Sequence, residues 1–161
     1  MKMSNLLRFS ALIPFFALMS ALIPPEDSGG RVVHLRYLPV ADRIGNAGET
    51  PLCTLLTSRL QYEKLFGEQK CSIDFNNEWA FFYSAGWKPT TGYEAQVVDV
   101  GYRQDVHMIV FTTQLASPGR NCVESPLATK PYSLVKFAIP PGRVDTVRLL
   151  TDDIVVSCDA K

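Results

Sequence analysis

The stretch WAFFYSAGWKPTTGYEAQVVDVGYRQDVHMIVFTT, residues 79–113, decides the fold. Its first seven letters are apolar on both faces, which is typical of a central strand covered on two sides. Residues 93–100 and 106–113 then repeat with a period of two, and a loop rich in Gly, Pro and Thr precedes them. The stretch therefore predicts three consecutive β-strands.

Outward from this stretch, the period of two returns at residues 32–37, 133–139, 144–150 and 153–158. A short helix is predicted to begin after Ser58, because Ser58 and Gln61 fit a capping box and Gly67 can end the helix. The expected fold is mainly β, an antiparallel immunoglobulin-like sandwich or partly open barrel with one short helix. A chain of 161 residues predicts one β-rich domain, here residues 32–161.

The N-terminal residues resemble a secretory signal rather than part of the fold. Lys2 and Arg8 precede an apolar run at residues 9–23, and Ser20 and Ala21 offer small residues for cleavage. A membrane anchor is the alternative, but a spanning helix needs about 20 apolar residues and this run contains Pro14. We expect a signal peptide at residues 1–21, a flexible leader at 22–31, and an exported protein that is periplasmic or extracellular and keeps no membrane span.

Charge and motifs exclude several classes of function. The 16 basic residues balance 16 acidic ones, so nothing favours binding to nucleic acid. No phosphate-binding glycine motif occurs, and no C-x-x-C supports a redox or zinc site. We therefore expect no cofactor and no metal.

The four cysteines, Cys53, Cys71, Cys122 and Cys158, suggest disulfides if the protein is exported. They allow three pairings. We favour Cys53–Cys71, at the two ends of the helical segment, together with Cys122–Cys158, which would tie a loop to the last strand. Four reduced thiols are the alternative.

No catalytic group of residues is convincing. His34 and His107 both lie inside predicted strands, whereas a Ser–His–Asp triad needs a histidine at a turn or cleft. Asp152 and Asp153 are neighbours, and neighbours in a strand point to opposite faces. We expect a protein that is not an enzyme, with an unrecognised hydrolase as a minor alternative.

Three loops carry residue types that are common at protein interfaces. The alternative for each is a plain connection between strands. The candidate partner-binding residues are Trp87, Lys88, Pro89, Thr90, Thr91, Gly92 and Tyr93 in the first loop, Arg120 in the second, and Lys130, Pro131 and Tyr132 in the third.

The run IDFNNEWAFFYSAGWKPTTGY, followed by a Val-rich strand, SPGRNC and KPYSLVKF, resembles the PrcB C-terminal-like family. The resemblance covers about residues 55–139. That family is named for an accessory subunit that stabilises an exported bacterial protease complex. The resemblance implies a non-enzymatic accessory protein that binds and stabilises a protein partner, an exported peptidase or protease complex.

The first loop is also similar to that of chagasin-type cysteine-peptidase inhibitors, whose motif is Asn-Pro-Thr-Thr-Gly-Tyr/Phe. Residues 89–93 match this motif, and Lys88 replaces its asparagine. Lys130, Pro131 and Tyr132 echo the Arg-Pro-aromatic motif of the inhibitors' third loop. This resemblance implies the alternative function, a peptidase inhibitor that acts through its loops.

Overall fold

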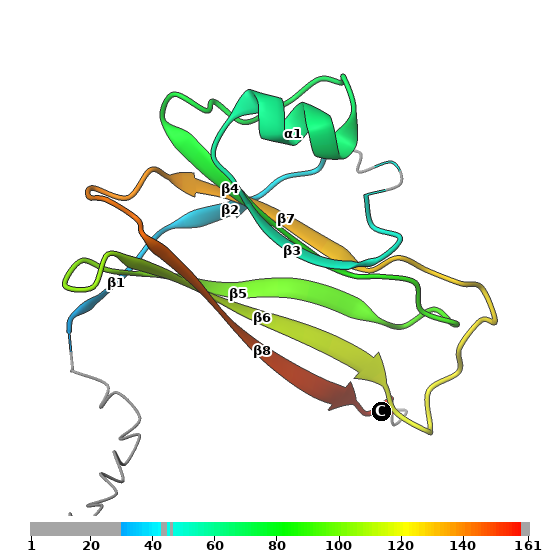
Figure 1. Cartoon of the computed structure of the whole chain (residues 1–161). Helices are drawn as coiled ribbons and strands as arrows, with labels where there is room; N and C mark the ends of the chain where they lie inside the picture. Colours follow the sequence, from blue (N-terminus) through cyan, green and yellow to red (C-terminus); the bar gives the residue numbers. More distant parts are fainter. Residues whose placement is uncertain (1–29, 43–44, 46, 159–161) are drawn as a thin grey trace, which may run out of the picture.

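The computed structural model describes residues 30–42, 45 and 47–158, which form two four-stranded β-sheets and one helix. The sheets pack face to face without closing into a barrel, and the helix covers the outer face of one of them (Figure 1). The expected mainly β sandwich with one short helix is confirmed. The expected signal peptide and most of the leader lie outside the described residues, within which no helix could span a membrane.

Sheet A has the order β1-β5-β6-β8, and sheet B has the order β2-β7-β4-β3. The strands of sheet A are β1 (Val32–His34), β5 (Glu94–Arg103), β6 (Met108–Pro118) and β8 (Thr146–Val156). The strands of sheet B are β2 (Tyr37–Pro39), β7 (Tyr132–Ala138), β4 (Glu78–Ala85) and β3 (Pro51–Leu56), and the helix is α1 (Arg59–Phe66).

Two apolar clusters hold the three layers together. The cluster between the sheets is built on Phe81, Phe111 and Phe137, which come from β4, β6 and β7. The cluster between sheet B and the helix is built on Tyr62 and Phe82, both fully buried. Strand β4 contributes to both clusters, and this explains why its sequence is apolar on both faces.

The short helix begins as its capping box predicts. The Ser58 hydroxyl accepts a hydrogen bond from the backbone N–H of Gln61, and the Gln61 side chain accepts one from the N–H of Thr57. Gly67 follows the last turn with φ +83°. The helix has only eight residues, so its contact with sheet B must supply most of its stability.

A bulge in β5 changes which side chains reach the core. Strict alternation of side chains along β5 would place Val97 and Val100 on opposite faces of sheet A. Both are nevertheless buried in the cluster between the sheets. The register against β6 shifts between Val97 and Asp99, so the extra residue returns Val100 to the inner face.

Two predicted strand boundaries are wrong. Residues 32–37 are not one strand, because the chain crosses from β1 in sheet A to β2 in sheet B. Residues 144–150 and 153–158 are not two strands, because β8 runs unbroken through Asp152 and Asp153.

Strand β8 also departs from the expected antiparallel pairing. After β7 the chain crosses to sheet A, where the N–H groups of Asp145 and Thr146 both bond the carbonyl of His107. His107 lies just before β6 in a turn with φ +50°, rather than inside a strand as predicted. Because β8 enters beside the start of β6, the two strands run parallel.

Candidate functional site

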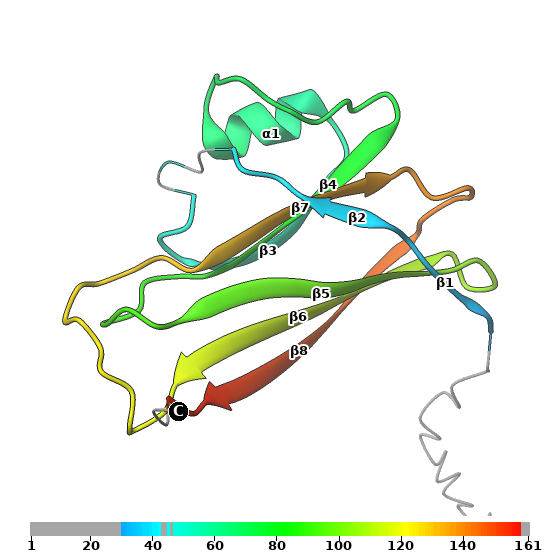
Figure 2. The same ribbon diagram turned by 180° about the vertical axis from the view of Figure 1, so that it is seen from behind.

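Two of the three candidate loops lie against each other at one end of the sandwich. Lys88 and Thr129 exchange both backbone hydrogen bonds, with N–O distances of 2.9 and 3.0 Å. This bridge joins the β4–β5 loop to the end of the β6–β7 loop, and both loops lie at the same end of the molecule (Figures 1 and 2). We call this surface, residues 86–93 and 124–132 with Glu49, the loop end.

An exposed tryptophan and a lysine form the most prominent contact of the loop end. The Lys130 amine lies 4.8 Å from the centroid of the Trp87 ring and 3.7 Å from a Glu49 carboxylate oxygen. The Trp87 N–H also bonds the Glu49 carbonyl at 3.3 Å. Although these contacts hold it in place, 54% of Trp87 stays exposed. An aromatic side chain that is both fixed and exposed is suited to binding a protein, since little entropy is lost when it is buried.

The two threonines of the first loop face inward. The Thr90 hydroxyl donates to the carboxylate of Glu124, and the Thr129 hydroxyl donates to the Thr90 carbonyl. The Thr91 hydroxyl accepts from the N–H of Ser125, and the Thr91 N–H donates to the Ser125 carbonyl. These side chains shape the loop end, and their hydroxyls are engaged within the protein although both residues stay partly exposed.

Gly92 and Tyr93 complete the first loop. Gly92 has φ +91°, and a Cβ atom there would lie 3.2 Å from Pro118, so the turn favours glycine. Tyr93 is partly buried, and the Lys88 amine lies 5.7 Å from its ring. Pro89 is exposed at the tip of the loop.

The remaining candidate residues are less closely grouped. Arg120 is exposed on the turn after β6, where the neighbouring Gly119 N–H bonds the Val156 carbonyl, and no contact joins Arg120 to the loop end. Pro131 supplies a carbonyl to the N–H of Ala85. Tyr132 begins β7 on the helix side of sheet B, near Phe82.

One of the two favoured disulfides is present. Cys122 and Cys158 are bonded, with a Cα–Cα distance of 4.9 Å, and they join the turn after β6 to the end of β8. The favoured Cys53–Cys71 bond is absent, and both cysteines are free. Cys53 belongs to β3 and lies on the inner face of sheet B beside Tyr83, whereas Cys71 packs into the cluster on the helix side. The sheet therefore separates the two thiols.

Three observations on the titratable groups of the described residues bear on the expectation that the protein is not an enzyme. His34 bonds Asp99 at 3.0 Å, and its side chain is 70% exposed. Although Cys53 is exposed overall, partial desolvation of its sulfur raises the pKa of the thiol, so this thiol is a poor nucleophile at neutral pH. In this part of the chain no group of three His, Cys, Asp or Glu side chains could hold a metal ion.

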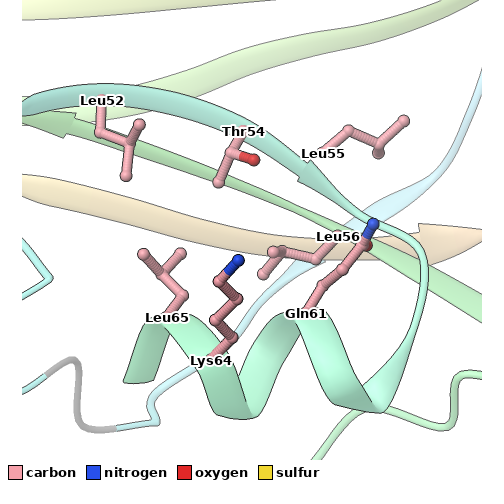
Figure 3. Close-up of a pocket in the computed structure, with 7 residues that line it drawn as sticks. All are labelled: Leu52, Thr54, Leu55, Leu56, Gln61, Lys64 and Leu65. Atoms are coloured by element: carbon pink, nitrogen blue, oxygen red, sulfur yellow. The ribbon is translucent and has the colours of Figure 1, made fainter. Parts of the chain in front are cut away.

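Sequence reasoning missed Glu49 and Glu124, which fix Lys130 and Thr90. Each lies in a loop without a motif, so only their packing against the other loops reveals them. It also missed a groove of about 340 Å³ between β3 and α1, which Figure 3 shows with Leu52, Leu56 and Leu65 facing one another. Strand β3 was not predicted, although its sequence PLCTLL is apolar enough to have indicated one.

Part of this chain matches the model of a known protein family. The matched region begins inside β4, includes both loops of the loop end, and closes with β7. Residues 80–138 match the PrcB C-terminal family. The PrcB-like region therefore contains Trp87 and Lys130, whereas β3, α1 and β8 lie outside it. Neither the curated proteins nor the solved structures gave a match to this chain. The similarity to chagasin-type inhibitors stays a prediction.

Proposed function

We propose that this protein is a non-enzymatic accessory protein that binds and stabilises an exported protein partner, a peptidase or a protease complex, through its loop end. The PrcB-like region supports the class of function, because that family is named for a subunit that stabilises a protease complex. Cys122–Cys158 supports an oxidising compartment outside the cytoplasm.

A single observation supports this surface above the others. Trp87 is more than half exposed, yet Lys130 lies over its ring and Glu49 holds the lysine. The two loops are locked by main-chain bonds between Lys88 and Thr129, so the surface is formed before any partner arrives. Burying Trp87 against a partner would gain apolar contact at a low cost in conformational entropy.

The test is a pull-down from the envelope extract of the source organism, with purified wild-type protein and a Trp87→Ala variant as baits. We expect wild type to recover a peptidase or protease-complex subunit and Trp87→Ala to recover at least about tenfold less, as for a central interface aromatic. The partner's thermal midpoint should rise with added wild-type protein, because a ligand of the folded state stabilises it by mass action.

Leu60→Ala is the matched control. Leu60 is 76% exposed on α1, outside the PrcB-like region, so its truncation removes exposed apolar surface without touching the loop end. Equal recovery by wild type and Trp87→Ala would contradict the proposed surface. Recovery of no peptidase by any bait would contradict the proposed function.

A loop-based peptidase inhibitor is the second candidate, and the closeness of the first and third loops favours it. The inward-facing hydroxyls of Thr90 and Thr91 count against it, because those motif residues are engaged within the protein. Activity of the recovered peptidase separates the two functions. An inhibitor lowers its turnover, whereas a stabiliser leaves turnover intact and extends its lifetime.

A further inference from the structure

Strand β8 is the last strand of sheet A, and among the described residues no strand pairs with its outer edge. All of its residues are exposed, including Val147 at 47%, Leu150 at 42% and Val155 at 75%. It pairs with β6 along its whole length without a bulge, and it contains neither proline nor lysine, although Asp153, in register with Leu115, places one charge on the inner face. A long regular edge of this kind is a ready template for another strand.

The free edge presents the backbone groups of alternate residues. The Val156 carbonyl accepts a bond from Gly119, and the carbonyls of Leu150 and Ile154 accept bonds from hydroxyls on β6. Even-numbered residues of β8 therefore direct their N–H and C=O groups toward β6. The odd-numbered residues Val147, Leu149, Thr151, Asp153 and Val155 direct theirs outward, where an added strand can bond them.

The charges on β8 are arranged to match a second copy of the same strand. Arg148 and Leu150 lie with Val110 of β6 on the outer face of sheet A, and Asp152 follows on that face. Within the described residues neither Arg148 nor Asp152 makes an ion pair, and about 13 Å of extended chain separates them within one strand. Each therefore has a charge available to another chain.

We propose that two copies of this protein pair antiparallel through β8, about a two-fold axis at Leu150, so that Arg148 of each copy faces Asp152 of the other. In this register Leu150 meets Leu150 of the second copy. The outward-directed Leu149 and Thr151 form the hydrogen-bonded pairs. Arg148 and Asp152 occupy the closer, non-hydrogen-bonded positions, where cross-strand side chains interact best.

Moving the two-fold axis from Leu150 toward the C-terminal end of β8 removes the Arg148–Asp152 pairs. An axis at Thr151 sets both Asp152 and Asp153 opposite leucines, and an axis at Asp152 sets that residue against itself. With the axis at Leu150 the Arg148–Asp152 pair occurs twice, because the interface is isologous. It joins the two copies of sheet A into one continuous sheet.

The test uses the full chain, purified with its disulfide intact, in a sedimentation-equilibrium concentration series. We expect a dimer, judged against the mass of the denatured chain. Arg148→Asp places two aspartates face to face at two sites and should raise the dimer dissociation constant at least about tenfold. Arg148→Asp combined with Asp152→Arg restores opposite charges and should return that constant to within about threefold of wild type.

Lys70→Asp is the control, because it makes the same charge change on an exposed loop away from β8. Circular dichroism checks that each variant is folded. A wild type that stays monomeric at every concentration would overturn the proposal and leave the β8 edge to a different protein. A dimer that Arg148→Asp does not weaken, or that the double exchange does not restore, would overturn it too.

Discussion

The rings of Phe81 and Phe111 stack face to face between the two sheets, with centroids 3.8 Å apart and an angle of 7° between their planes. Both side chains are buried. Replacing Phe111 with alanine removes this contact and leaves a cavity, so we expect a loss of about 3–5 kcal/mol in the free energy of unfolding. Urea denaturation measures the loss. Val98→Ala, on the exposed face of β5, should cost less than about 1 kcal/mol, and equal losses would contradict this view of the core.

Gly86 ends β4 at a place where no side chain fits. Its φ is +70°, and a Cβ atom would lie 2.7 Å from the Pro51 ring, so Gly86→Ala combines backbone strain with a clash. We expect a loss of at least about 2 kcal/mol in unfolding free energy. Gly67 is the matched control, since its φ is +83° but nothing lies within 4 Å. Thermal melts that rank Gly67→Ala as equally damaging would show that the clash with Pro51 is relieved at little cost.

The disulfide should be a major source of stability, and the free cysteines should not. Replacing Cys122 and Cys158 by serine opens a loop with a sequence separation of 36, for which we expect a loss of about 3–4 kcal/mol. Replacing Cys53 and Cys71 by serine should cost less than about 1 kcal/mol, because Cys53 is exposed and Cys71 only partly buried. Alkylation of the denatured, unreduced protein should modify only Cys53 and Cys71. Mass spectrometry that finds four blocked or four free thiols would contradict the pairing.

The ionisation of Tyr62 makes the free energy of unfolding depend on pH in the alkaline range. Burial, together with the hydrogen bond from its hydroxyl to Asp42 at 2.8 Å, raises its pKa well above the usual value of about 10. The folded state holds the phenolic proton of Tyr62 more tightly than the unfolded state does. The stability that this difference supplies is therefore complete below a pH of about 10, and it is lost as the pH rises toward the pKa of the folded state. The urea midpoint of wild type should therefore fall more steeply between pH of about 10 and 12 than that of Tyr62→Phe. Parallel curves would show that Tyr62 does not carry this dependence.

The layers of the fold could be predicted because their residues carry local signals. Phe81 lies in a run that is apolar on both faces, and β4 is indeed covered on two sides. The spacing of Ser58 and Gln61 alone predicted the start of the helix. Trp87 and Lys130 stood out in the sequence because they are unusual residues for plain connections, and their role in binding a partner stays a prediction.

The rest depends on contacts between distant residues, which no local pattern encodes. The parallel direction of β8 follows from the bonds of Asp145 and Thr146 to His107, far away in the sequence. Cys53 and Cys71 are only 18 positions apart by their numbers, yet the intervening sheet face keeps them separate. Glu49 and Glu124 belong to the site only because the loops meet in space.

The disulfide has a mechanical consequence. Force applied to the chain beyond Cys158 passes through the bond directly to Cys122, so β8 is bypassed and is not peeled from β6. An unfolding machine that pulls from this end must break a covalent bond or disrupt the turn after β6 before it extracts the strand. Reduction of this one bond would expose β8 to the pulling force.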